Sequence, residues 1–93
     1  MLVLMVGTFK SGTFDEMMRL QPEFSQHLGQ PLLRIHTAGA LVNADGRQAG
    51  FMIVLESASL EAARSYLKTD PFLSNGLYEH VDLVEYRVEA GRL

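Results

Sequence analysis

Apolar runs and amphipathic segments alternate along the chain, and their lengths predict its secondary structure. Residues 2–9 are almost continuously apolar and rich in Val and Leu, which is typical of a strand covered on both faces. Segments with apolar residues at helical spacing alternate with further runs of this kind. The other elements predicted are a helix at 14–28, strands at 32–41 and 50–56, a helix at 60–70 and a strand at 80–88.

Polar residues at the ends of these segments predict where the helices start and stop. Thr13 and Glu16 have the spacing of a capping box, and Ser59 is an expected N-cap for the second helix. Pro22 lies inside the first helix, where proline removes a hydrogen bond, so the helix is expected to be kinked or split there. In the last strand, the alternation of apolar residues slips after Leu83, which predicts a β-bulge.

The predicted order β-α-β-β-α-β is that of the ferredoxin-like α+β fold. In this fold a four-stranded antiparallel sheet carries two helices on one face. Residues 1–93 are expected to form a single domain of this kind. Because two helices cover only one face, strands that are apolar on both faces predict that a second copy covers the other. Two sheets packed face to face would form a dimeric α+β barrel. The expected assembly is thus a homodimer, from which a higher oligomer could also be built.

Composition narrows the classes of partner and compartment. The chain is 47% hydrophobic and 20% charged, with a net charge of −3, so it offers no basic surface for nucleic acid. No Lys/Arg cluster indicates a membrane surface, and the apolar N-terminal run is too short to span a bilayer. The absence of cysteine excludes disulfides and thiolate metal sites and fits a reducing compartment, so a cytoplasmic protein is expected.

The sequence Asp70-Pro71-Phe72 is the most distinctive motif. A residue before proline is forced out of the α-helical region, so Asp70 is expected at a helix exit with a fixed direction. An acid held in this way is either a catalytic group or a capping residue.

The chain resembles the YCII family of YciI-like proteins. The resemblance rests on Arg19, Ala38-Gly39, Asp45-Gly46, Gly50, Glu56, the segment Ser59-Leu60-Glu61-Ala62-Ala63, Asp70-Pro71-Phe72 and Gly76-Leu77. It implies a dimeric α+β barrel. The family's members are mostly of unknown function, and one relative looks like a dehydrochlorinase. The family pattern also pairs the Asp of Asp-Pro-Phe with a histidine three residues after an arginine. Counting from Arg19, Pro22 occupies that position here.

Asp70 is the first candidate for catalysis, as a general base or a carboxylate that orients a ligand; otherwise it is a helix-exit acid bound to backbone or to Arg19. His36 is the best substitute for the missing histidine. If Ile35 faces the helices, strand alternation turns His36 and Ala38 toward the barrel interior. A lone strand histidine also suits a purely packed position.

Other residues are candidates for ligand binding. Arg19 is an expected clamp for an anionic group or a surface residue, and Phe72 is a pocket wall or an anchor of the turn. His80 follows the Asp-Pro-Phe turn closely enough to line a pocket mouth. His27 is expected to be a solvated residue at the helix end, where an imidazolium suits the helix dipole.

Two functions from different classes remain open. The three histidines are scattered, so neither a metal site nor any other cofactor is predicted. The first interpretation is a dimer with a pocket for a small polar or aromatic molecule and no intact acid/base pair. The alternative is a cofactor-independent enzyme for elimination or isomerisation, which uses Asp70 with His36 as a substitute acid.

Overall fold

The computed structural model describes residues 1–29 and 33–92 and contains the predicted elements in the predicted order. Its elements are β1 (Leu2–Phe9), α1 (Phe14–Leu28), β2 (Arg34–Val42), β3 (Gln48–Glu56), α2 (Leu60–Leu67), α3 (Pro71–Ser74) and β4 (Tyr78–Tyr86). The short helix α3 is an addition to the prediction. Pro31 and Leu32, the latter the predicted start of the second strand, lie outside the described residues.

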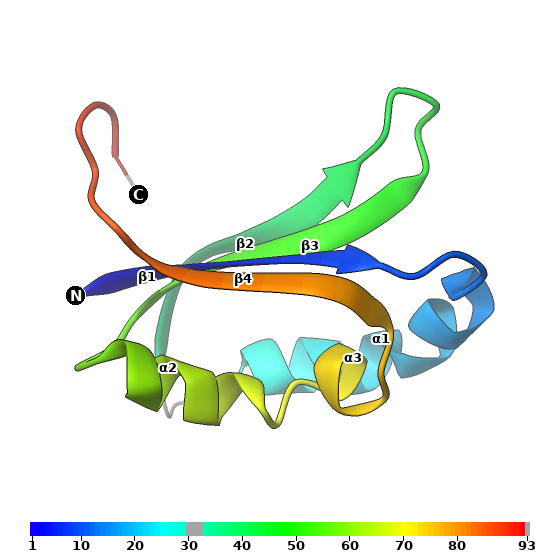
Figure 1. Cartoon of the computed structure of the whole chain (residues 1–93), viewed down its shortest axis with the longest axis horizontal. Coiled ribbons are helices and arrows are strands. Elements are labelled where there is room, and N and C mark those ends of the chain that lie inside the picture. The colour runs from blue at the N-terminus through cyan, green and yellow to red at the C-terminus, as the bar shows by residue number, and fades with distance from the viewer. Residues whose placement is uncertain (30–32, 93) are drawn as a thin grey trace.

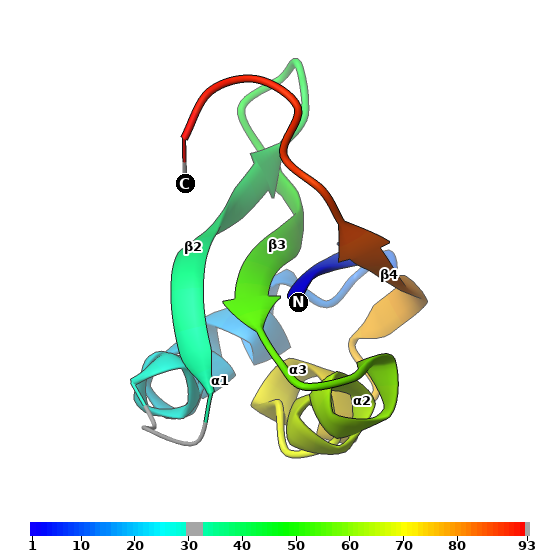
Figure 2. The same ribbon diagram turned by 90° about the vertical axis from the view of Figure 1, so that its left-hand side faces the viewer.

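The four strands form one antiparallel sheet in the order β2-β3-β1-β4. The helices all lie on one face of this sheet (Figure 1). Seen along the strands, α1 lies below β2 and α2 lies toward β4 (Figure 2). The ferredoxin-like α+β fold is therefore confirmed. No described helix is both long enough and apolar enough to cross a bilayer.

The two faces of β1 meet different surroundings. Val3 and Met5 are fully buried against the helices, and the core beneath them is built mainly from Met17, Leu20, Phe24, Phe51, Ile53, Leu55, Leu67 and Phe72. The alternate residues point to the open face, because side chains alternate along a strand. There Leu4 lies between Val54 of β3 and Val84 of β4.

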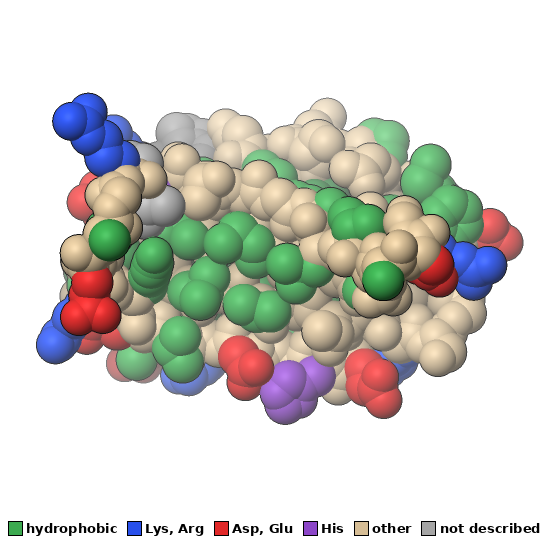
Figure 3. Space-filling model, turned by 90° about the horizontal axis from the view of Figure 1, so that it is seen from above, with side chains coloured by type: hydrophobic (Ala, Val, Ile, Leu, Met, Phe, Trp, Pro, Cys, Tyr) green, Lys and Arg blue, Asp and Glu red, His purple; other side chains and the backbone are tan. Residues whose placement is uncertain are grey.

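The open face of the sheet carries an apolar patch. We call it the open-face patch, and it consists of Leu2, Leu4, Val6, Met52 and Val84, which surround the buried Val54. Figure 3 shows this face with hydrophobic side chains gathered at its centre and charged ones along its rim. Val84 leaves 49% of its surface exposed. A contiguous exposed apolar patch is typical of an interaction surface.

Helix α1 differs from the prediction at its start and at its middle. The side chain of Thr13 makes no capping bond; its Oγ1 instead donates to the carbonyl of Lys10. Glu16 pairs with Arg19 rather than reaching back, so the predicted capping box is wrong. Pro22 lies inside a helix that continues through it, so the helix is not split.

The strand irregularities also lie at other positions than predicted. The pairing of β1 with β4 passes Leu83 and Val84 without a shift, so the predicted bulge there is wrong. The register shifts instead where Thr8 pairs with His80 and Phe9 with Tyr78, which leaves Glu79 as the extra residue. A second shift leaves His36 unpaired in β2. Bulges of this kind redirect the side chains beside them.

Candidate functional site

Asp70 is the N-cap of α3 rather than the end of the helix before it. Helix α2 ends at Leu67, and the backbone of Asp70 is extended, as the following proline requires. Its Oδ1 accepts hydrogen bonds from the backbone N–H groups of Phe72 (2.8 Å) and Leu73 (3.4 Å). Within the described part of the chain, the buried Oδ2 has no hydrogen-bond partner. One oxygen therefore holds the turn and the other is uncommitted.

Burial sets the electrostatics of this carboxyl. Asp70 is 0% exposed, and burial raises its pKa from 3.8 to about 6, although the N–H groups of Phe72 and Leu73 act in the opposite direction. Burial, together with the nearby Asp70 charge, also raises the pKa values of Tyr66 and Tyr78. Such a carboxyl is a candidate functional group on physical grounds, but in this conformation it is closed off from the surface.

The ring of Tyr78 packs against β1 and against Phe72 of the Asp70 turn. It stacks on Phe9, with ring centroids 5.2 Å apart, and it covers Gly7. A Cβ at Gly7 would come within 2.6 Å of this ring, so only glycine leaves the space. The bulge at Glu79 turns Tyr78 inward. Its hydroxyl is buried without a hydrogen-bond partner among the described residues.

A histidine of α1 is buried against α2. His27 is only 2% exposed, so the predicted solvated helix-end position is wrong. Its ring stacks on Tyr66 at 4.5 Å, and its Nδ1 lies 3.3 Å from the hydroxyl of Thr69. Burial lowers the pKa of His27, which favours the neutral ring. The length of α1 beyond Pro22 carries His27 under α2 instead of into solvent.

An open cleft of about 900 Å³ lies beside the Phe9 ring. The β1–α1 loop, the start of α1 and the β2–β3 hairpin form its walls. Its lining consists of Phe9, Lys10, Ser11, Gly12, Thr13, Phe14, Met17, Asn43, Gly46, Arg47, Gln48 and Ala49. Phe9 connects the two regions, because it also packs against Phe72 at 5.5 Å. None of the residues singled out from the sequence as site residues lines this cleft.

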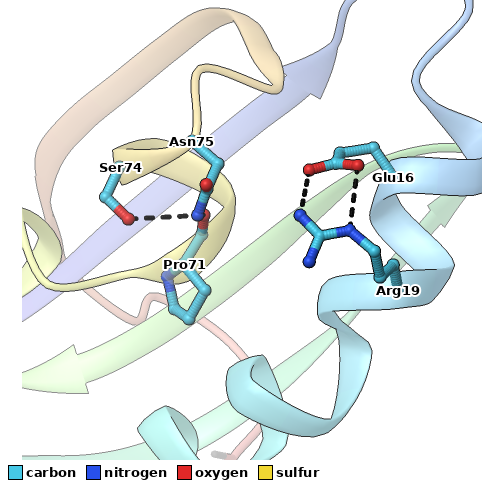
Figure 4. A network of polar contacts seen from close by, with 5 residues as sticks. All are labelled: Glu16, Arg19, Pro71, Ser74 and Asn75. Atoms are coloured by element: carbon cyan, nitrogen blue, oxygen red, sulfur yellow. Dashed lines mark hydrogen bonds and ion pairs between the residues drawn. The ribbon is translucent and has the colours of Figure 1, made fainter.

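Arg19 has a partner on its own helix. Its guanidinium binds the carboxylate of Glu16, with Nε 3.1 Å from Oε2, and 61% of the Arg19 side chain is exposed. Figure 4 shows this pair on α1 opposite α3, where Pro71 accepts a hydrogen bond from the side chain of Asn75. Because Asp70 is buried behind this turn and bonded to backbone, Arg19 and Asp70 do not form an ion pair.

His36 lies at the edge of the sheet. Its Nε2 is 3.9 Å from Glu56, too long for a hydrogen bond, and has no other partner among the residues described. The expected alternation is wrong here. Ala38 packs against the core on the same side as Ile35, because the shift at His36 changes the register. The structure therefore gives His36 and Asp70 separate surroundings.

The remaining candidates have contrasting exposure. Phe72 is fully buried and stacks on Phe24 at 4.1 Å, so its contacts are those of a core anchor. His80 is exposed on β4 and lies 3.2 Å from Asp82. Among the described residues, no group of three or more His, Asp or Glu is placed to hold a metal ion.

Comparison with known proteins identifies the family. The YCII-related domain matches residues 1–87. The chain belongs to the YCII family. Proteins named YciI from Escherichia coli and Shigella flexneri are each 29% identical to it, over 94% of this chain and 97% of theirs.

Solved structures agree with this YCII fold. The 5-chloro-2-hydroxyhydroquinone dehydrochlorinase from Burkholderia phenoliruptrix, in complex with 2,5-dihydroxybenzoquinone, has a TM-score of 0.86 at 18% identity, covering 94% of each chain. An uncharacterized NIPSNAP domain protein from Burkholderia xenovorans has a TM-score of 0.54 at 10% identity, covering 99% of this chain and 100% of its own. At these identities the likeness shows the fold alone.

Position 22 is where the resemblance to the family implies a histidine. Pro22 is exposed, and the buried stripe of α1 consists of Met17, Leu20, Phe24 and His27. At 100° per residue, position 22 is about 160° from both Leu20 and Phe24 on the helix. A side chain at this position points away from the buried Asp70.

Residues missed by sequence reasoning are Lys10, Arg47, Phe14 and Tyr78. For Tyr78 a signal exists, because a glycine inside a strand indicates close approach of another group, and Gly7 is such a glycine. For the cleft residues no signal exists, since their proximity depends on how the hairpin and the β1–α1 loop meet.

Proposed function

We propose that this YCII protein is a homodimer that binds a small polar or aromatic molecule in the cleft beside Phe9, without catalysis by Asp70. The observation that carries the proposal is the contrast between the cleft and the carboxyl. The cleft of about 900 Å³ is open and lined by aromatic and polar side chains. Asp70 is 0% exposed.

The lining of the cleft suits small-molecule recognition. Binding sites combine apolar walls with a few polar groups that fix orientation. Here Phe9 and Met17 supply apolar surface, and Ser11, Asn43 and Gln48 supply hydroxyl and amide groups.

The position of Asp70 supports a structural role. Its Oδ1 holds the start of α3, and α3 places Phe72 in the core. Phe72 packs against Phe9, which lines the cleft. The Asp-Pro-Phe turn thus acts on the cleft through the Phe9 wall. Pro22 is exposed on the side of α1 opposite its buried stripe, so position 22 supplies no acid/base partner to Asp70.

The open-face patch supports dimerisation. An antiparallel sheet with one face on helices normally has a polar second face, whereas here Leu4, Val6 and Val84 stand on it. A second copy packed on this patch would complete a barrel. The absence of cysteine is consistent with a cytoplasmic dimer.

A metabolite screen by thermal shift tests the binding function. A ligand that binds only the folded state raises the unfolding temperature by mass action. A hit should shift the backbone amide resonances of the β1–α1 loop and the β2–β3 hairpin. If hits instead perturb only residues 70–78, or if a broad metabolite panel gives no hit, the proposed binding function is wrong.

A second candidate function is cofactor-independent elimination, and a specific observation favours it. Asp70 has a pKa raised to about 6 and an Oδ2 without a partner among the described residues, as a general base needs. In such a step its carboxylate takes a proton from a ring hydroxyl of the keto tautomer. The O–H electron pair forms a carbonyl, and the leaving group departs from the saturated ring carbon with its bonding electron pair. The chain shares its fold with a dehydrochlorinase.

Chloride release from 5-chloro-2-hydroxyhydroquinone tests this second function. Enzymatic elimination predicts turnover by the wild type and its loss in Asp70→Asn, with Asp82→Asn as an exposed control. Absence of turnover above background would exclude this compound as a substrate of the protein. Equal turnover by both variants would show that Asp70 is not the base.

A further inference from the structure

The walls of the cleft come from two loops shaped by glycine. Gly12 in the β1–α1 loop has φ +76°, and Gly46 in the hairpin has φ +85°. Such positive φ values suit glycine far better than other residues. The two turns bring Lys10 and Arg47, which are far apart in sequence, to the lining of one cleft.

The charge of this lining is opposite to that of the whole chain. Lys10 and Arg47 are the charged residues that line it, and no Asp or Glu lines it, although the chain carries a net charge of −3. In the described part of the chain, the Lys10 ammonium has no hydrogen bond or ion pair. The Lys10 ammonium lies beside Gly76, 4.0 Å from where a Cβ there would stand, so Lys10 and Arg47 supply cations from two different walls of the cleft. Cations around a cleft raise the local concentration of anions.

Nearby acids offset this charge only in part. Asp45 lies 3.8 Å from Nε of Arg47, while its Oδ1 accepts the backbone N–H of Arg47 and so holds the hairpin turn. Glu16 is bound to Arg19, and Asp15 is exposed in the first turn of α1. Most of the Arg47 guanidinium remains available, since 87% of its side chain is exposed.

An apolar surface lies next to these cations. Phe14 leaves 63% of its surface exposed at the rim of the cleft, the largest exposed fraction among the large hydrophobic residues described. Phe9, unlike Phe14, is packed on other rings: it stacks on Tyr78 and makes an edge contact with Phe72. One aromatic ring is thus packed in place and another is exposed where a ligand can contact it.

We propose that the cleft selects an aromatic anion: a single-ring molecule whose carboxylate, or an equivalent anionic oxygen group, binds Lys10 and Arg47 while its ring packs on Phe14 and Phe9. This inference rests on the proposed binding function and adds the chemical class of the ligand. The volume of about 900 Å³ is within the range of small-molecule sites and exceeds what one ring requires.

A matched pair of probes tests the role of charge. 4-Hydroxybenzoate and its neutral analogue 4-hydroxybenzamide have nearly the same shape, and each is titrated against the full chain while amide chemical shifts are followed. The inference predicts that the carboxylate binds at the cleft more tightly than the amide, by about fivefold or more. Its advantage should shrink as salt is added, because exposed charges are screened.

Variants of the lining residues sharpen the test. Lys10→Met and Arg47→Gln should each weaken 4-hydroxybenzoate binding about fivefold and leave the amide unaffected. Asp45→Asn keeps the oxygen that holds the turn and removes the opposing charge, so it should tighten binding of the carboxylate. Arg87→Gln, an exposed arginine paired with Glu85 outside the cleft, is the matched control and should change nothing.

The outcomes separate this inference from the binding function. Equal affinity for the two probes, or unchanged binding in Lys10→Met and Arg47→Gln, overturns the aromatic-anion assignment while hits from the metabolite screen still support a pocket. Binding of neither probe at the cleft also overturns the assignment, and the screen then decides the binding function by itself.

Discussion

At the scale of single residues, the two carboxylate oxygens of Asp70 have opposite effects on the stability of the fold. Its Oδ1 is a helix cap of ordinary geometry, and its Oδ2 is a buried oxygen without a described partner. A buried carboxylate is unfavourable when ionised. The hydrogen bonds of the cap therefore stabilise the folded state, while the buried charge destabilises it.

The first prediction concerns the pH dependence of stability. Burial raises the pKa of Asp70 from its ordinary value of 3.8 to about 6 in the folded chain, so the folded chain holds this proton more tightly than the unfolded chain. The associated stability is present below pH 3.8 and is lost as the pH rises through 6, by about 3 kcal/mol in total. Asp70→Asn keeps the capping oxygen and lacks this loss.

Urea denaturation of the two proteins between pH 4 and 7 measures this effect. The free energy of unfolding of the wild type minus that of Asp70→Asn should fall by about 2 kcal/mol across this range, because part of the total is already lost at pH 4. Asp82→Asn, at an exposed position of β4, is the control and should show a much smaller change. A difference that stays flat with pH for Asp70→Asn would contradict the buried environment described for this carboxyl.

The residue scale also shows what the sequence could predict. The cap at Ser59 is confirmed, because its side chain accepts the N–H of Ala62 three residues later in the same helix. Local spacing suffices for such a contact. The burial of His27 depends on its packing against α2, which no local pattern encodes. Gly7 signals that some group approaches β1 closely, but the bulge at Glu79 that turns Tyr78 toward it is not visible in the sequence.

At the scale of elements, α1 continues through a proline, although proline in a helix interior normally kinks or breaks the helix. Pro22 lacks the N–H that would bond to the carbonyl of Met18, yet the helix runs from Phe14 to Leu28. The buried stripe continues on both sides of it, with Leu20 before and Phe24 after. Packing of this stripe on the sheet therefore outweighs the local cost, and this balance cannot be judged from the helix sequence alone.

The second prediction follows from this balance. Pro22 is exposed, so Pro22→Ala restores a hydrogen bond without disturbing the core. The free energy of unfolding should rise by roughly 1–3 kcal/mol. Chemical denaturation measures it, and Ser25→Ala on the same helix should give a change of about 0.5 kcal/mol or less. An unchanged or lower stability for Pro22→Ala would mean that the helix is shaped to fit this proline.

Strand prediction succeeded where apolar runs are long and failed where register shifts. The run at 2–9 is β1 almost residue for residue. The extra residues His36 and Glu79 leave no mark in the apolar pattern. A shift of one residue reverses which face a side chain occupies. The predicted orientation of His36 and Ala38 is therefore wrong although the strand itself is correctly predicted.

At the scale of the whole molecule, the open-face patch is the feature without an internal explanation. The helices cover one face of the sheet (Figure 1), while the other exposes apolar side chains (Figure 3). The sequence alone predicts an apolar surface on this second face, since strands that are apolar on both faces need cover on both. The cleft was not predictable, because it forms between a loop and a hairpin.

The third prediction is that the open-face patch holds a homodimer. Light scattering should give twice the chain mass of 10.4 kDa at micromolar concentration. Val84→Glu should yield a monomer, because a two-fold interface places the new charge in both copies. Met18→Glu changes an apolar residue of similar exposure on α1 and should remain dimeric. A monomeric wild type, or a dimeric Val84→Glu, would contradict the interface.

The most direct test of the whole account is calorimetric titration of one ligand from the metabolite screen into three proteins: the wild type and two variants. Asp70→Asn removes the buried carboxylate, and Phe14→Ser removes an exposed ring at the cleft rim. Binding in the cleft without participation of Asp70 predicts that Asp70→Asn binds with the affinity of the wild type and that Phe14→Ser binds several-fold more weakly. Loss of binding in Asp70→Asn, with Phe14→Ser unchanged, would contradict it and return the site to the Asp-Pro-Phe turn.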